Sequence, residues 1–276
     1  MTRKAQFRSK RINRLPPIVM WTAVLLTTID PAFAASRDGR QIMKRVYEQD
    51  TSRGTSVRAT FESFDKQGHS KKKELLYRRL GEPGNIKTLV VFASPEEIRG
   101  VKLLSINQRG AEIRQYLFIP ATKRVRTIAQ QERSARFIGT DFTIEDIGEP
   151  ALDDFSYRLL GDSEIIERHK TFKIEATPID ASRTQYKFID YWVAQDAPVI
   201  LQSELYDSQG RLTRVLHASQ IKRVSGIWGA RRREMSTVAD GTRTVLTIDQ
   251  AKFNVKMDER LFTPESLEVT DDPGLR

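Results

Sequence analysis

Apolar and polar residues alternate with a period of two along most of the chain between residues 55 and 253. In residues 55–66, for example, Val57, Ala59 and Phe61 fall on one side of an extended chain and polar residues on the other. Such alternation is typical of strands with one buried face, and no strand–helix–strand rhythm interrupts it. The pattern therefore predicts one large antiparallel sheet, curved or closed. Two domains that divide near residues 130–154 are the alternative.

A curved sheet of this size needs side chains to fill its concave face. Few segments are predicted to be helical: residues 36–50, capped by Ser36 or Asp38, residues near 141–147, and a single turn at 258–262. If these segments lie across the opening, they enclose an apolar cavity that suits an acyl chain better than a polar metabolite. We expect residues such as Val90, Leu104 and Leu117 to line it.

Glycines mark the connections between several of these strands. Asp240-Gly241 is typical of a type I′ turn, and Ser208-Gln209-Gly210 of a short loop whose glycine has a positive φ. The connection at residues 130–154 is much longer, and connections of that length are usually functional or disordered.

The first 34 residues have the organisation of a secretory signal peptide. A basic segment at residues 1–14 precedes an apolar run from Ile18 to Ile29, and Ala32-Phe33-Ala34 provides small residues at a cleavage site. A membrane anchor is the alternative, but the apolar run is shorter than the ~20 residues that span a bilayer. We therefore expect an exported mature domain at residues 35–276, with no transmembrane segment after cleavage.

Removal of the signal peptide lowers the net charge from +10 to about +5. Much of the basic character thus belongs to the targeting segment, which argues against nucleic acid as a partner. The chain contains no cysteine, so disulfides cannot stabilise it, but about 240 residues suffice for a large hydrophobic core.

The sequence contains no recognisable catalytic or cofactor motif. Its three histidines, His69, His169 and His217, are not at metal-ligand spacing, and there is no G-x-S-x-G, G-x-G-x-x-G or phosphate-binding loop. We therefore expect neither an enzyme nor a cofactor or metal. The acidic cluster at 141–149 is interpreted as helix capping, with Thr140 or Asp141 as N-cap and Gly148 as the end.

Residues 116–147 combine apolar and charged positions that could close a cavity. The candidate lid and lipid-binding residues are Leu117, Phe137, Ile138, Phe142, Ile144 and Ile147. A basic group before them could contact an anionic headgroup or form a latch with acidic residues after it. The latch residues are Lys123, Arg124, Arg126, Asp141 and Asp146, and the predicted pairing is Arg124 or Arg126 with Asp141 or Asp146. A solvated hairpin tip is the alternative.

The same segment resembles the signature of the outer membrane lipoprotein-sorting protein-like family, relatives of the periplasmic lipoprotein carrier LolA. The matching positions are Leu117, Pro120, Lys123, Arg124, Val125, Arg126, Ile128, Arg133, Ser134, Phe137, Gly139, Asp141, Phe142, Glu145 and Asp146. The ending at 258–268 is also similar. The resemblance implies an incomplete antiparallel β-barrel of about 11 strands, with a helical lid over a hydrophobic cavity.

The resemblance also implies a periplasmic carrier that takes the acyl chains of a lipid or lipoprotein towards the outer membrane, in some members beside an RND-type inner-membrane transporter. The alternative is an accessory subunit that docks on such a transporter and carries nothing. On the carrier hypothesis, Phe142→Asp abolishes lipid uptake and leaves the fold intact.

Overall fold

The structure is a computed structural model that describes residues 38–269. The predicted signal peptide at 1–34, and with it the domain boundary at residue 35, lies outside the described residues. Within residues 38–269, every helix is too short or too polar to cross a membrane.

The described chain forms one antiparallel sheet of 14 strands, which is more than the predicted number of about 11. The spatial order is β6-β5-β4-β3-β2-β1-β14-β13-β12-β11-β10-β9-β7, and β8 pairs with β9 alone. The strands are β1 (Gly54–Phe64), β2 (Ser70–Glu82), β3 (Asn85–Ser94), β4 (Lys102–Gln108), β5 (Arg114–Ile119), β6 (Arg124–Thr127), β7 (Phe155–Gly161), β8 (Ile165–Ile166), β9 (His169–Pro178), β10 (Tyr186–Ala194), β11 (Ile200–Asp207), β12 (Leu212–Val224), β13 (Ile227–Thr237) and β14 (Thr242–Phe253).

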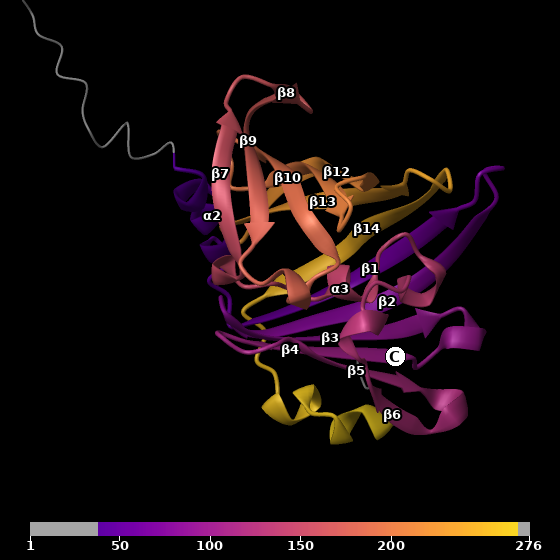
Figure 1. Cartoon of the computed structure of the whole chain (residues 1–276). Helices are drawn as coiled ribbons and strands as arrows, with labels where there is room; N and C mark the ends of the chain where they lie inside the picture. Colours follow the sequence, from indigo (N-terminus) through magenta and orange to yellow (C-terminus); the bar gives the residue numbers. More distant parts are fainter. Residues whose placement is uncertain (1–37, 270–276) are drawn as a thin grey trace, which may run out of the picture.

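The sheet curls on itself without closing, because β6 and β7, at its two ends, do not pair with each other. The strands β7, β9 and β10 therefore lie opposite β3–β5, with the chain between β6 and β7 in the space between them (Figure 1). The expected incomplete antiparallel barrel is confirmed in this form.

The strands β3 and β4 are apolar on both faces because both faces are covered. Val90 and Phe92 belong to the cluster on the concave face. Leu89, Val91 and Leu104 instead pack on the outer face against Phe262 and Leu267, which come from the C-terminal turns η7 (Glu259–Phe262) and η8 (Glu265–Glu268). Leu104 was predicted to line the cavity; this was wrong, since it points to the opposite face.

The helix α2 (Gly39–Glu48) covers the concave face at the β7 end of the sheet (Figure 1). Asp38 caps it and accepts a hydrogen bond from the backbone N–H of Arg40 at 3.1 Å. Of the two predicted caps, Ser36 and Asp38, the structure has Asp38. Ile42 and Met43 are fully buried against Ile174 and Val193 of β9 and β10. The predicted amphipathic helix thus provides one wall of the interior.

The glycine turn predicted at residues 208–210 is confirmed, but the type I′ turn predicted at Asp240-Gly241 was wrong. Gly210 has the expected positive φ of 75°. In the loop between β13 and β14 only Gly241 has a positive φ, and its N–H bonds to the carbonyl of Thr237. A type I′ turn needs two such residues, and the two-residue loop Ser225-Gly226, with φ of 51° and 85°, meets that condition instead.

The connection between β6 and β7 contains only short helical turns: η3 (Gln130–Glu132), η4 (Phe137–Gly139), α3 (Ile144–Ile147) and η5 (Leu152–Asp154). Positive φ values at Ile138 and Gly139 interrupt helical geometry before α3, and Gly148 ends it. A continuous helical lid is therefore not confirmed. We call residues 128–154 the crossing segment.

Candidate functional site

Aromatic side chains fix the first part of the crossing segment to the concave face of the sheet. Phe137 packs on Phe92 of β3, and Phe142 on Phe61 of β1, each with ring centroids 5.4 Å apart. Phe137 is 1% exposed. Removing such surfaces from water stabilises the docked segment by about 2–3 kcal/mol for each ring.

The predicted lid residues all join one apolar cluster. Phe137, Phe142, Ile144 and Leu117 are buried members of it, whereas Ile138 and Ile147 pack against it. Only Phe142 among these six also lines the main cavity. The sequence therefore identified residues that hold the segment in place more than residues that could touch a ligand.

A cavity of about 410 Å³ lies between the crossing segment and the concave face of β9–β13. Its floor is apolar and comes from β10–β13, where Leu205 and Met235 belong to the same buried cluster as Phe142. The apolar and aromatic lining residues include Phe142, Phe155, Tyr186, Ile189, Tyr191, Leu205, Leu216 and Met235. The charged lining residues are Arg109, Arg133, Glu145, Asp146, Asp153, Asp154, Asp180 and Arg183.

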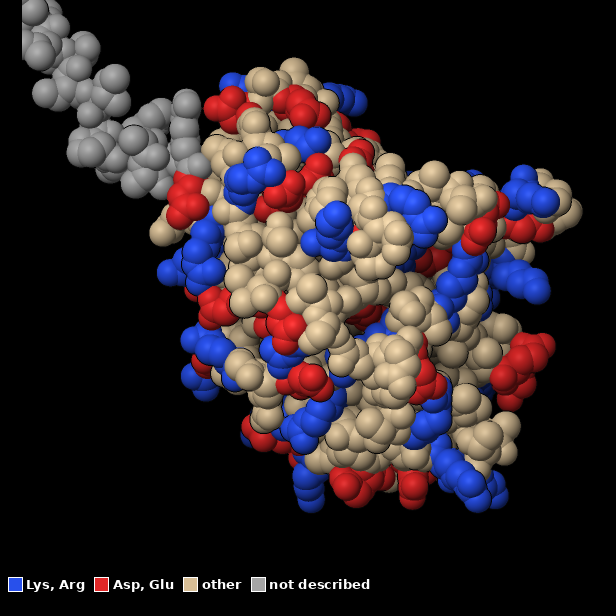
Figure 2. Space-filling view, viewed as in Figure 1, with Lys and Arg blue, Asp and Glu red and all other residues tan. Residues whose placement is uncertain are grey.

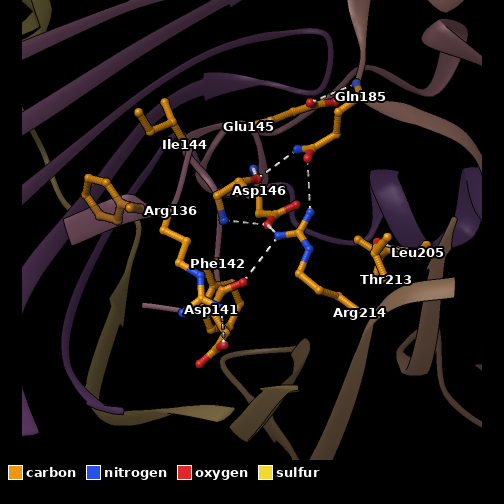
Figure 3. Close-up of polar contacts among 12 residues, drawn as sticks. Arg136, Asp141, Phe142, Ile144, Glu145, Asp146, Gln185, Leu205, Thr213 and Arg214 are labelled. Carbon is orange, nitrogen blue, oxygen red and sulfur yellow. Dashed lines mark hydrogen bonds and ion pairs between the residues drawn. The ribbon is translucent and has the colours of Figure 1, made fainter. Parts of the chain in front are cut away.

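A buried ion pair anchors α3 to the second half of the sheet (Figure 3). The Arg214 guanidinium of β12 donates to Asp146 at 2.5 Å and also to the Tyr186 hydroxyl, which itself donates to Asp146. Both charged side chains are less than 10% exposed. Burial acts to lower the pKa of Arg214, but Asp146 and Tyr186 together outweigh it and raise that pKa, so the guanidinium keeps its charge.

Asp141 is held by hydroxyl groups on β13 and β14. Its side chain accepts hydrogen bonds from Thr237 at 2.6 Å, Thr242 at 2.5 Å and Thr244 at 2.7 Å. Arg136 lies 3.5 Å from the same carboxylate. Asp141 is 2% exposed, and three donors with a nearby cation satisfy a carboxylate at that depth.

Two further carboxylates tie the crossing segment to other parts of the sheet. Glu145 accepts from the Thr184 hydroxyl and from the backbone N–H of Gln185 at 3.1 Å, and its burial raises its pKa. Glu149 accepts from Tyr77 and Arg79 of β2. The acidic cluster therefore anchors the segment to strands on both sides of the interior.

The interpretation of this cluster as simple helix capping was partly wrong. Thr143 is the N-cap of α3, not Thr140 or Asp141, and Asp146 completes the capping box from its side chain. The predicted end at Gly148 is confirmed.

The predicted latch pairing was also wrong. Arg126 pairs with Glu132, six residues away, and Lys123 and Arg124 are exposed. The edge strand β6 carries these residues away from Asp141 and Asp146, which bond instead to Arg136 and Arg214. One signal in the sequence does point to Arg214: it shares the face of its strand with Leu216 and Ala218, and an arginine in an apolar stripe needs a buried partner.

Charged side chains are spread over the part of the chain that the structure describes. No group of three or more His, Asp or Glu side chains there could hold a metal ion. The histidines lie apart, each beside one carboxylate: His69 beside Asp65, His169 beside Asp196, and His217 beside Glu167. On the face in Figure 2, basic and acidic side chains are interspersed without a continuous basic patch.

Solved structures share this fold. A putative outer membrane lipoprotein-sorting protein domain from Vibrio parahaemolyticus is similar at a TM-score of 0.78 and 23% identity, over 83% of this chain and 98% of that one. A DUF1329 family protein from Desulfovibrio piger has a TM-score of 0.79 and 24% identity, over 86% of this chain and 99% of that one. A LolA superfamily protein from Nitrosomonas europaea has a TM-score of 0.67 and 19% identity, over 83% of this chain and 99% of that one.

The sequence comparisons give the family. No curated protein matches the chain significantly. A family model described as "Uncharacterized protein" matches residues 84–269, which is about two thirds of the chain. The chain therefore belongs to the family of that model, and it shares the fold of the LolA superfamily protein and of the lipoprotein-sorting protein domain.

Proposed function

We propose that this protein is a periplasmic carrier that binds the acyl chains of a lipid or lipoprotein in its cavity and takes them towards the outer membrane. The observation that carries the proposal is the cavity with its apolar floor on β10–β13, which includes Leu205, Leu216 and Met235. The rest of the concave face is filled by aromatic side chains of the crossing segment or covered by α2.

The energetics of acyl transfer explain why such a cavity is useful. Each methylene group costs ~0.8 kcal/mol to expose, so a chain of ~16 carbons costs on the order of 12 kcal/mol in water. An apolar cavity removes most of this barrier between two membranes. The proposed role is binding and transfer, with no chemical step and no cofactor.

Organic extraction of the purified protein, followed by lipid mass spectrometry, tests the proposal directly. We expect acyl lipids in the extract of the parent chain and little in that of Leu216→Trp, since an indole at this lining position fills the cavity. Leu160→Trp is the matched control, because Leu160 is 39% exposed and does not line the cavity. Equal lipid content in all three proteins would exclude the cavity as the binding site.

Phe142→Asp, the substitution suggested by the sequence, is a poor test of the same idea. Phe142 is 5% exposed and contacts Phe61, so a carboxylate there removes core packing and is buried without a designed partner. We expect loss of the fold as well as loss of lipid.

Delivery and partner form a separate part of the proposal. We expect the lipid-loaded protein to transfer its lipid to acceptor vesicles, and an RND-type inner-membrane transporter to cross-link to it in cells. A chain that co-purifies with a transporter but never with lipid would support an accessory subunit instead.

A further inference from the structure

The carboxylates that line the cavity all have hydrogen-bond partners. Asp146 pairs with Arg214, and Asp153 with Arg40 at 2.5 Å. Glu145 accepts from Thr184 and Gln185. Backbone N–H groups donate to Asp154 and Asp180 from Ala151 and Ser182. Each of these five carboxylates thus has a donor within the protein, and two of them are also paired with an arginine.

The three arginines that line the same cavity have no ion pair among the described residues. They are Arg109, Arg133 and Arg183. Arg109 is exposed and Arg183 half-buried, so water can solvate both to some degree. Arg133 is 8% exposed. Its Nη2 donates to the carbonyl of Ile113, and its enclosed Nε has no hydrogen-bond partner.

An arginine in that position is costly without an anion. A buried charge is normally paired, because its lost hydration is otherwise uncompensated. Burial lowers the pKa of Arg133, and the positive charge of Arg183 acts in the same direction, although Glu112 and Glu145 oppose it. The lowered pKa shows that the surroundings of this guanidinium supply less negative charge than its burial calls for.

The position of Arg133 at the cavity connects this unmet charge to the apolar floor. Arg133 follows η3 in the crossing segment, and Arg183 belongs to η6 (Ala181–Arg183), which precedes β10. Both line the cavity together with Phe142, Leu205 and Leu216. The cavity thus combines cationic groups with an apolar interior, as an amphiphile with a negative head requires.

We propose that the cavity recognises a single-chain amphiphile whose carboxylate or phosphate group is bound by Arg133 and Arg183. This rests on the proposed function and specifies its ligand. The acyl chain lies against Phe142, Leu205 and Leu216. One chain fits better than two or three, because about 410 Å³ is near the lower end of the ~300–1,000 Å³ range of ligand pockets.

Calorimetric titration at pH 8 separates the headgroup from the chain. The probes are palmitate, 1-palmitoyl-lysophosphatidic acid, neutral 1-monopalmitoylglycerol, two-chain dipalmitoylphosphatidylglycerol and inorganic phosphate. We expect both single-chain anions to bind about tenfold or more tightly than monopalmitoylglycerol, since a charge-assisted hydrogen bond contributes more than a neutral one. Inorganic phosphate alone should bind far more weakly.

Two arginine variants and a control test the residues. Arg183→Gln, in a short surface turn, and Arg133→Gln should each weaken the binding of palmitate about tenfold. Neither should change the affinity for monopalmitoylglycerol. Arg45→Gln is the control, because Arg45 is exposed on α2 and does not line the cavity. If Arg133→Gln fails to fold, Arg183→Gln still decides the question.

The possible results distinguish this inference from the proposed function. Equal affinity for palmitate and monopalmitoylglycerol overturns the headgroup site but leaves a lipid carrier. Tighter binding of the two-chain lipid overturns the single-chain assignment. Phosphate that binds as tightly as the lysophosphatidic acid makes this a free-anion site. Failure of every lipid to bind overturns both proposals.

Discussion

The two halves of the sheet differ in what covers their concave faces. On β1–β5, Phe137, Phe142 and Ile144 of the crossing segment pack directly on the strands. On β10–β13, the same segment is attached mainly by polar side chains at its edge, and Leu205 and Leu216 face a cavity. Apolar packing fills the space between the crossing segment and the strands. A few bonded carboxylates instead fix the position of the segment and leave the cavity between it and the strands. The concave face of the first half is thus closely packed, whereas that of the second half borders the cavity.

The largest effect is expected where the packing is complete. Phe137→Ala removes a ring that is 1% exposed and packs on Phe92. It should lower the free energy of unfolding by about 4 kcal/mol, because the lost burial adds to the cost of the space left behind. Urea denaturation followed by circular dichroism measures this. A loss below about 1 kcal/mol would mean that the crossing segment is not docked on β3.

The ion pair between Arg214 and Asp146, on the other half of the sheet, should contribute slightly less to the free energy of unfolding. Arg214→Met leaves Asp146 buried with only the Tyr186 hydroxyl and the Thr143 N–H as donors. We expect a loss of about 3 kcal/mol, since one uncompensated charge remains.

A double-mutant cycle with Asp146→Leu checks the origin of that loss. The double variant should be more stable than Arg214→Met alone, because no unpaired charge remains. Strict additivity of the two single changes would show that the pair does not couple the segment to β12.

The sequence predicted one half of this comparison better than the other. Alternation located most strands, and Phe137, Phe142 and Ile144 were identified from local apolar character. The pairing of Asp146 with Arg214 spans 68 residues, and no local pattern specifies which of several basic residues the curl of the sheet brings there. Arg124 and Arg126 were chosen because they are near in sequence. The cavity was equally hidden, because its position depends on how the crossing segment docks on the curled sheet.

A substitution at the floor of the cavity sharpens the contrast between the halves. Leu216 is only half-buried and lines the cavity. Leu216→Ala should therefore lower the free energy of unfolding by about 1 kcal/mol, well below the cost of Phe137→Ala, since little packing is lost and no closed void is created. Urea denaturation of the lipid-free protein gives the value. A loss equal to that of Phe137→Ala would mean that the floor is packed like the first half.

The smallest effect should appear as a change with pH. Burial raises the pKa of Glu145 above its value in the unfolded chain, so the native state holds this proton more tightly than the unfolded state does. The stability that Glu145 contributes is then present below its unfolded pKa and is lost as the pH rises through the folded one. Glu145→Gln removes this loss, so the stability of the variant relative to the parent should rise between pH 4 and pH 7. Urea midpoints across that range measure it. A relative stability that falls with pH would mean that the hydrogen bonds from Thr184 and Gln185 outweigh burial. The site would then favour the charged form of Glu145.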